Sequence, residues 1–188
     1  MNYPSDEQIA EMMRQLTQAR IENFLGQHMG IWQWWVLVIL LIAPWFIWYK
    51  LVDKKRILEV TLFGVIIMVF TITLDEIGFV LSLWSYPVEV IPILPRLTSI
   101  DYTMLPIIFM LVYQYFPTWK NFFGALVVLS TVFSFVAEPI VVHLGFYVLI
   151  QWLYWYSFPI YIVMGLLARW IVRILIDIER AVKKDNDL

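Results

Sequence analysis

The chain contains no cysteine. It therefore forms no disulfide, holds no iron–sulfur cluster or thiolate-bound metal, and offers no cysteine nucleophile. Neither an HExxH zinc motif nor a GxSxG nucleophile elbow occurs in the sequence. Charged residues are also scarce, at 15% of the 188 residues. These absences exclude cysteine chemistry and leave the best-known hydrolase motifs unrepresented.

Apolar residues are abundant instead, at 62% of the chain, and the mean hydropathy is +0.77. Soluble domains contain roughly 45–50% apolar residues, so the composition indicates an integral membrane protein. The apolar runs divide into segments of about 20 residues, the length that crosses a bilayer as a helix. The prediction is all-α: one domain over residues 31–176, built as a bundle of five transmembrane helices. The predicted spans are 31–48, 57–83, 102–116, 121–142 and 155–176.

Residues 1–30 are polar and are predicted to form an amphipathic helix over about 4–25 that precedes the bundle. Ser5 can cap this helix, and Gln8 occupies the matching capping-box position. Ile9, Met13 and Leu16 recur at helical spacing and make one apolar stripe. The helix is expected to lie in the membrane interface; packing on the bundle or on a second copy is the alternative. A basic n-region and a small-residue cleavage site are missing, so no cleaved signal peptide is expected.

The positions of the basic residues predict the orientation. If the cluster at 50–56 is cytoplasmic, five spans place ten of the thirteen lysines and arginines on that side. Only Arg14, Arg20 and Arg96 then lie outside. We therefore expect an outside N-terminus and a charged cytoplasmic tail over 177–188. Asp177 and Glu179 dilute the basic charge of this tail, so it suits anionic lipid headgroups rather than nucleic acid.

The connection between the second and third spans contains Pro87, Pro92 and Pro95, which rule out a regular helix. Its other residues are too apolar for a free loop, so it is predicted to fold as a cap over the bundle. A weak internal repeat is also present. In each unit an acid near the end of one span is followed by a connection with aromatic residues, and then by a span with a proline near its start. The first unit is Asp75, Trp84, Tyr86 and Pro106; the second is Glu138, Phe146, Tyr147 and Pro159.

Acidic residues within apolar runs are the strongest functional signal, because a carboxylate in hydrocarbon is unfavourable unless it is neutral, paired or hydrated. Counting at about 1.5 Å per residue places Asp75 roughly 28 Å and Glu138 roughly 25 Å along their helices, both towards the outer surface. Asp101 and His143 are predicted at the same level. Three arrangements fit: a structural network of ion pairs and hydrogen bonds, a carboxyl pair that retains a proton, or an oxygen-rich metal site completed by His143.

Aromatic residues allow a further interpretation. Acid-catalysed chemistry on a lipid or isoprenoid needs a carboxylic acid in a dry aromatic pocket. Such a pocket could be formed by Trp84, Tyr86, Tyr102, Tyr156 and Tyr161. The alternative is that these side chains only pack in the bundle or anchor it at the membrane interfaces.

Four stretches resemble a known family: IWQWWVLVILLIAPWFIWYKLVDKKRILE at 31–59, LWSYPVEVIPILPRLTSIDYTMLP at 83–106, YQYFPTWK at 113–120 and YSFPIYI at 156–162. The family is an uncharacterised set of small multi-pass membrane proteins of Bacillus- and Clostridium-type Firmicutes. The resemblance implies a bacterial plasma membrane location and a one-domain helical protein, and it transfers no site residues.

A second resemblance is to the lycopene-cyclase-type membrane domain, in which an acid, an aromatic element and a proline follow in an order comparable to Asp75, Trp84, Tyr86 and Pro95. Arg96 stands where that domain has an acid.

The leading hypothesis is an outward-facing acidic cavity around Asp75, Glu76, Asp101 and Glu138 that binds a small ligand, a cation or a lipid headgroup. The chain would then serve as an accessory or sensor subunit. The alternatives are an intramembrane enzyme that acts on a lipid or isoprenoid, and a small transporter or channel. No cofactor is expected; membrane lipids, a membrane-protein partner or a second copy are the expected partners. The candidate ligand-binding residues are Asp75, Glu76, Trp84, Tyr86, Arg96, Asp101, Tyr102, Glu138 and His143.

Overall fold

The computed structural model describes residues 3–94 and 96–186. It is 80% helical. Four helical stretches are long and apolar enough to cross a membrane: Trp32–Leu51, Lys54–Val80, Trp119–His143 and Tyr154–Asp185. The fold is therefore nearly all-α, and its apolar helices indicate a protein embedded in a membrane.

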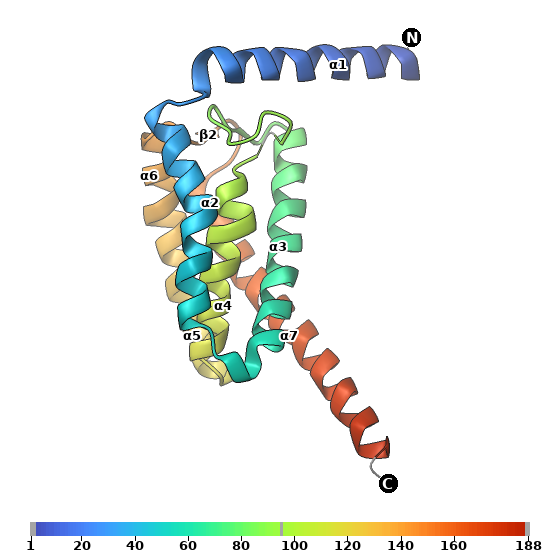
Figure 1. Cartoon of the computed structure of the whole chain (residues 1–188), viewed down its shortest axis with the longest axis vertical. Helices are drawn as coiled ribbons and strands as arrows, with labels where there is room; N and C mark the ends of the chain where they lie inside the picture. Colours follow the sequence, from blue (N-terminus) through green and yellow to red (C-terminus); the bar gives the residue numbers. More distant parts are fainter. Residues whose placement is uncertain (1–2, 95, 187–188) are drawn as a thin grey trace.

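The helices and strands follow one another in the order drawn in Figure 1. They are α1 (Asp6–Asn23), η1 (Phe24–His28), α2 (Trp32–Leu51), η2 (Lys54–Arg56), α3 (Ile57–Val80), β1 (Trp84–Ser85), η3 (Ile100–Met104), α4 (Leu105–Tyr115), α5 (Trp119–Val132), η4 (Phe133–Ala137), α6 (Glu138–His143), β2 (Val148–Leu149) and α7 (Tyr154–Asn186).

Helix α1 lies across one end of the bundle, nearly at right angles to α2 and α3 (Figure 1). The predicted capping box is present: the Ser5 hydroxyl accepts from the Gln8 amide at 3.2 Å, and the Ser5 amide donates to Gln8 Oε1 at 2.9 Å. The apolar side chains of Ile9 and Met13 are exposed. The bundle therefore leaves the apolar stripe of α1 uncovered.

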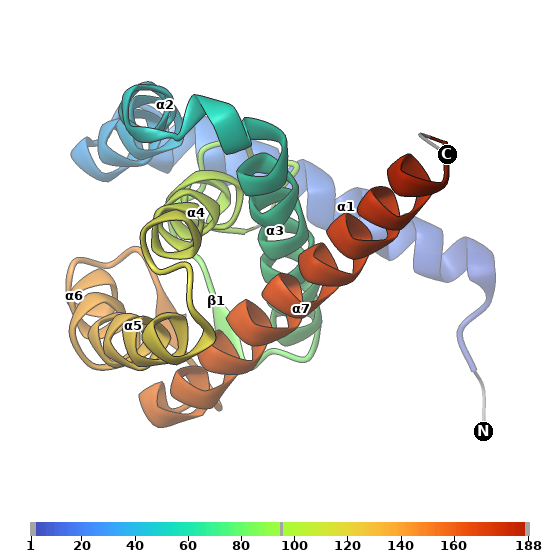
Figure 2. The ribbon, with the colours of Figure 1, turned by 90° about the horizontal axis from the view of Figure 1, so that it is seen from below.

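The bundle is held together by the packing of α3 against α4 and α7, and of α5 against α7. Figure 2 shows these helices from below, with α7 running beside α3 and α5. Phe63, Phe109 and Phe122 are fully buried at the centre. Close approach is possible because α3 has Gly64 opposite Met110, where an added Cβ would lie 2.4 Å from the Met110 sulfur. Small residues of this kind let membrane helices pack closely.

The connection after α3 folds back over the end of the bundle, as its apolar character predicts. Strand β1 pairs antiparallel with β2, with Trp84 opposite Leu149 and Ser85 opposite Val148. The Trp34 indole donates to the Val90 carbonyl at 3.3 Å. A small apolar cluster joins this cap to α2; its buried members are Leu37, Val88, Leu97 and Phe146. The cap is thereby fixed over the helices rather than free in solution.

Two turns of π-helix interrupt the helices at the acidic residues. In η3 the amide of Leu105 bonds to the carbonyl of Ile100, and in η4 the amide of Glu138 bonds to the carbonyl of Phe133. Each π turn is followed by a proline, Pro106 or Pro139, which has no N–H to donate to the preceding turn. Single π turns of this kind often occur at functional sites.

At the opposite end, Arg169 of α7 fixes the end of α4. It is 1% exposed, donates to the carbonyls of Phe116 (2.9 Å) and Pro117, and lies 4.5 Å from the Phe122 ring centroid. A cation at a helix C-terminus satisfies carbonyls that have no helical partner. Beyond this point α7 leaves the bundle and projects as a single helix (Figure 1). The predicted tail at 177–188 thus continues α7 as far as the structure describes it.

Candidate functional site

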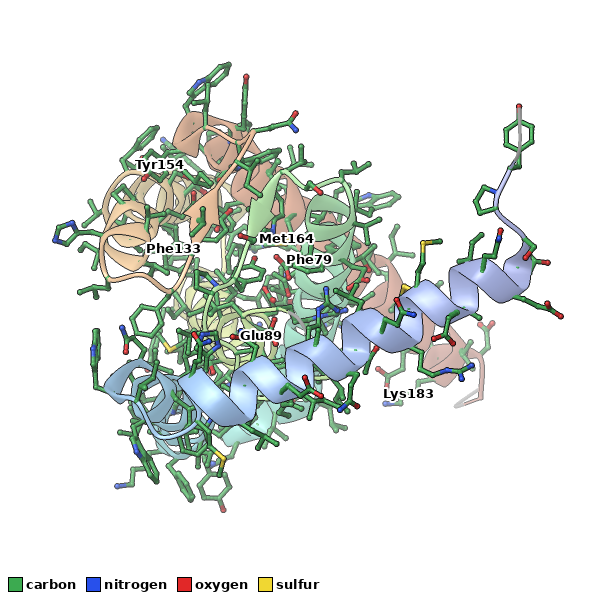
Figure 3. The ribbon with its side chains drawn as sticks, turned by 90° about the horizontal axis from the view of Figure 1, so that it is seen from above. Phe79, Glu89, Phe133, Tyr154, Met164 and Lys183 are labelled. Carbon is green, nitrogen blue, oxygen red and sulfur yellow. The ribbon has the colours of Figure 1, made fainter. Side chains whose placement is uncertain are left out.

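A cavity of about 440 Å³ lies within the capped end of the bundle. Its walls come from α2, α3, η3, α4, η4, α6, α7, the strand β1 and the connections of the cap. Most of the lining side chains are apolar, including Phe133 and Met164, which Figure 3 labels. Three carboxyl groups also line it: those of Asp75, Asp101 and Glu138. Cavities of roughly 300–1,000 Å³ with a few convergent polar groups are typical of small-molecule sites.

Asp75 is held by two donors from the cap. The Trp84 indole donates to Asp75 Oδ1 at 3.0 Å, and the Tyr86 hydroxyl donates to the same oxygen. Trp84 reaches this position because α3 has Gly78 beneath it, where a Cβ would lie 2.0 Å from the indole ring. A glycine at this place in α3 is therefore a requirement of the site.

Asp101 approaches Asp75 from η3. The two carboxyl groups lie within hydrogen-bonding reach of each other, and the Oδ2 atom of each is buried without a donor. The backbone around Asp101 is fixed by the Thr71 hydroxyl, which donates to the Asp101 carbonyl at 3.1 Å. Two acids from separate elements thus form one carboxyl pair in the cavity wall.

Glu138 lies in another part of the wall and has its own donors. The Ser157 hydroxyl donates to Glu138 Oε2 at 3.0 Å, and the Tyr161 hydroxyl donates to Oε1 at 2.9 Å. The Trp152 indole in turn donates to Ser157 Oγ at 2.9 Å. Glu138 is therefore a fully supported acceptor, in contrast to the Asp75–Asp101 pair.

Aromatic rings connect the two acidic groups through the cap. Trp84 packs edge-on against Trp152 with ring centroids 4.9 Å apart, and Tyr86 stacks on Tyr147 at 5.4 Å. Burial raises the pKa of both tyrosine hydroxyls above the ordinary value. Both hydroxyls therefore stay protonated at neutral pH, and that of Tyr86 donates to Asp75.

Four of the predicted site residues do not line the cavity. Glu76 is half exposed and forms an ion pair with Arg96, which has only 13% of its side chain exposed. His143 is exposed at the end of α6, and Tyr102 is half-buried in η3. These placements differ from the predicted cavity. On α3, Glu76 is turned by about 100° from Asp75 and pairs with Arg96 instead of lining the cavity. Arg96 still lies close enough to Asp75 and Asp101 to interact with both electrostatically.

Three residues of the site were missed by the sequence analysis: Tyr147, Trp152 and Ser157. Ser157 and Tyr161 are four residues apart, so they lie on the same face of α7. This four-residue spacing could have indicated, from the sequence alone, that Ser157 and Tyr161 face the same acid. Tyr147 and Trp152 lie in an irregular connection, where no periodicity predicts which side chains turn inward.

The arrangement provides hydrogen-bond acceptors in an apolar enclosure. Among residues 3–94 and 96–186, no group of three or more His, Cys, Asp or Glu side chains is placed to hold a metal ion. The site can accept hydrogen bonds from a ligand at the Asp75–Asp101 pair, or supply a proton from that pair. Its apolar walls suit a hydrocarbon body.

Comparisons with known protein families, with curated proteins and with solved structures found no match.

Proposed function

We propose that the protein binds an amphipathic small molecule within the membrane. The observation that carries this proposal is the cavity itself: three carboxyl groups from three separate elements line one apolar enclosure of about 440 Å³. Buried carboxyls in an apolar wall are costly, and those of Asp75 and Asp101 each retain an oxygen without a donor that a ligand could satisfy. The ligand's polar group lies at the acids, and its apolar body lies along the helices.

The experiment is to purify the protein in a mild detergent, extract bound molecules and analyse the extract by mass spectrometry. The matched variant is Ala137→Phe, which places a ring in the cavity beside Glu138 without changing any charge. A molecule that is enriched with the wild type and absent from the variant supports the proposal. Identical extracts from two equally well folded proteins would contradict it.

Glu138→Gln gives a second test of the same proposal. Glutamine keeps an acceptor oxygen for Ser157 or Tyr161 but removes the carboxylate. We expect thermal stabilisation by the extracted ligand to become weaker in this variant. An unchanged ligand response would remove Glu138 from the binding site.

Acid catalysis on a lipid or isoprenoid is the second candidate. It is favoured by the carboxyl pair of Asp75 and Asp101 together with the aromatic rings of Trp84, Tyr86 and Tyr147 around it. One carboxyl can hold the proton that is transferred, and the rings can stabilise a cationic intermediate. Lipid and isoprenoid profiles of cells with and without the gene test this candidate. Identical profiles, with wild-type protein present, would contradict it.

We also propose that η3 and α4 together form a fifth span, in a plasma membrane of a Firmicutes-type bacterium. Their sixteen residues, η3 with five and α4 with eleven, extend along α2 and α3 in Figure 1. With five spans, most basic residues lie on the cytoplasmic side with the C-terminus, and α1 lies in the outer interface. Membrane lipids, a membrane-protein partner or a second copy remain the proposed partners, and membership of the Firmicutes family remains a proposal from the resemblance.

A further inference from the structure

The Asp75–Asp101 pair is the least satisfied polar group of the cavity. Asp75 is 7% exposed and Asp101 is 6% exposed, yet each has a buried Oδ2 atom without a donor. The neighbouring charged and hydroxyl groups are already engaged. Arg96 is paired with Glu76 through Nη2, although its buried Nε has no acceptor; the Tyr86 hydroxyl donates to Asp75, and Glu138 has its own donors. The unused acceptor capacity of the cavity is therefore concentrated at this pair.

Two adjacent carboxylates cannot both be ionised in an apolar wall without strong repulsion. One proton between them removes the repulsion and accounts for both Oδ2 atoms, because the protonated carboxyl donates to the other. The donors of Trp84 and Tyr86 on Asp75 Oδ1 favour Asp75 as the ionised partner. The pair then carries one negative charge next to a cavity that is otherwise apolar.

We propose that this singly charged pair binds the primary ammonium group of a long-chain amine, whose hydrocarbon chain fills the cavity. This inference rests on the proposed function and names the class of its ligand. A primary ammonium carries one positive charge and three N–H donors, so it matches the charge of the pair and the carboxyl lone pairs that the shared proton leaves free. Arg96 interacts electrostatically with both carboxyls, but its charge is also paired with Glu76, so it offsets the charge of the pair only in part.

The experiment measures binding of dodecylamine and of dodecanol to the protein in phosphatidylcholine nanodiscs, with empty nanodiscs subtracted. The two probes have the same chain and differ in the charge of the polar group. We expect the wild type to bind the amine about tenfold more tightly than the alcohol, as expected for one charge-assisted contact. The double variant Asp75→Asn/Asp101→Asn should bind both probes equally, because its wall carries no charge.

The single variant Asp101→Asn tests the shared proton. Its amide can donate to Asp75 as the protonated carboxyl does, and the pair keeps one negative charge. We therefore expect the amine preference to stay within about threefold of the wild-type value. Glu22→Gln, which removes an exposed carboxylate from α1, controls for the net charge of the protein. A loss of the preference in Asp101→Asn, without a loss in Glu22→Gln, would overturn the singly charged pair.

The failures of the two proposals are distinguishable. If the wild type binds both probes equally and Ala137→Phe binds neither, the proposal of an amine ligand is overturned. The cavity would still be a binding site. No binding of either probe above empty nanodiscs would overturn both proposals for this ligand class. The preference for the amine is compared between the wild type and the variants in the same lipid, so the different partitioning of the two probes into the bilayer cancels from that comparison.

Discussion

Asp75 and Glu76 are neighbours in sequence and have opposite surroundings. Asp75 faces the cavity with donors from Trp84 and Tyr86, whereas Glu76 pairs with Arg96 at the surface of the bundle. The difference follows from helix geometry, which turns successive side chains by about 100°. At the scale of single residues, the site is therefore defined by which donors the cap brings to each carboxyl group, rather than by the number of acids in a stretch.

The hydroxyl of Tyr86 provides a direct test of this support. Tyr86→Phe removes one donor from Asp75 and leaves the ring stacked on Tyr147. We expect a loss of about 0.5–1.5 kcal/mol in unfolding free energy, the range typical of hydrogen bonds inside membrane proteins. Unfolding in a denaturing detergent measures this loss. Tyr147→Phe is the control, because Tyr147 stacks on the same ring and lines the same cavity. Equal losses in both variants would show that packing, not the bond to Asp75, accounts for the effect.

Glu138 supports a second prediction at this scale. Glu138→Ala leaves the hydroxyls of Ser157 and Tyr161 without their acceptor, so we expect a cost of about 1–3 kcal/mol. Glu138→Gln retains an acceptor and should cost less than half as much. Unfolding in denaturing detergent measures both variants. The reverse order of stabilities would contradict the hydrogen-bond network described for α6 and α7.

The cap is the element that completes the site. Strands β1 and β2 are only two residues long, yet their pairing brings Trp84 close to Trp152 and closes the cavity over the acids. The two connections that pair are the ones that follow the acid-bearing helices, as the weak internal repeat in the sequence describes. The cap therefore couples the two acidic groups that the helices alone would present separately.

An engineered disulfide tests this pairing without interference, because the chain has no cysteine. Ser85 and Val148 lie directly opposite each other in the strand pair. Opposed residues in antiparallel strands have Cα atoms about 4.5–5.5 Å apart, within the range that a disulfide requires. We expect Ser85→Cys/Val148→Cys to crosslink under mild oxidation. Ser85→Cys/Gln151→Cys, three residues out of register, should not. Equal crosslinking of both pairs would mean that the strands are not paired as described.

Glu89 gives the cap a pH dependence. Burial raises the pKa of Glu89 to about 7, and the nearby charge of Arg20 opposes part of that rise. Figure 3 labels Glu89 beside α1, the helix that contains Arg20. In the unfolded chain the carboxyl has an ordinary pKa near 4.5, so between these values the folded state binds more protons than the unfolded state. Stability should therefore be fully present below the unfolded pKa and should decrease as the pH rises through about 7.

The measurement is the unfolding midpoint from about pH 5 to about pH 8, in wild type and in Glu89→Gln. The glutamine variant should lose the part of the pH dependence that Glu89 causes. Glu22→Gln, at an exposed site on α1, should retain it. A pH profile that is the same in wild type and Glu89→Gln would show that Glu89 titrates alike in the folded and unfolded states.

At the scale of the whole molecule, the parts that follow from local chemistry could be predicted from the sequence. Hydropathy gave the apolar helices, and the Ser5 capping box gave the start of α1. Residue counting placed Asp75 and Glu138 at one depth, because rise per residue is constant along a helix. It could not give the rotation of each helix, which depends on packing. That is why Glu76 was grouped with Asp75 around the cavity, which it does not line, and why Ser157 was missed.

The number of spans determines on which side of the membrane each end of the chain lies. If η3 and α4 cross the membrane, a cysteine at Gln18 in α1 and one at Lys184 in the tail face opposite sides. If they do not cross, both cysteines face the same side. The variants Gln18→Cys and Lys184→Cys, labelled in intact cells with a membrane-impermeant maleimide, separate these topologies. We expect labelling of Gln18→Cys from outside and labelling of Lys184→Cys only after permeabilisation.

Lys54→Cys and Lys120→Cys complete this test, because Lys54 lies in η2 just before α3 and Lys120 lies in the first turn of α5. Five spans place both turns in the cytoplasm, where basic residues are favoured. If η3 and α4 did not cross the membrane, Lys120 would lie outside and Lys54 would still lie inside. We therefore expect neither variant to be labelled in intact cells and both to be labelled after permeabilisation. Labelling of Lys120→Cys in intact cells would reduce the spans to four, and would place the polar end of the cavity and the C-terminus on the same side of the membrane.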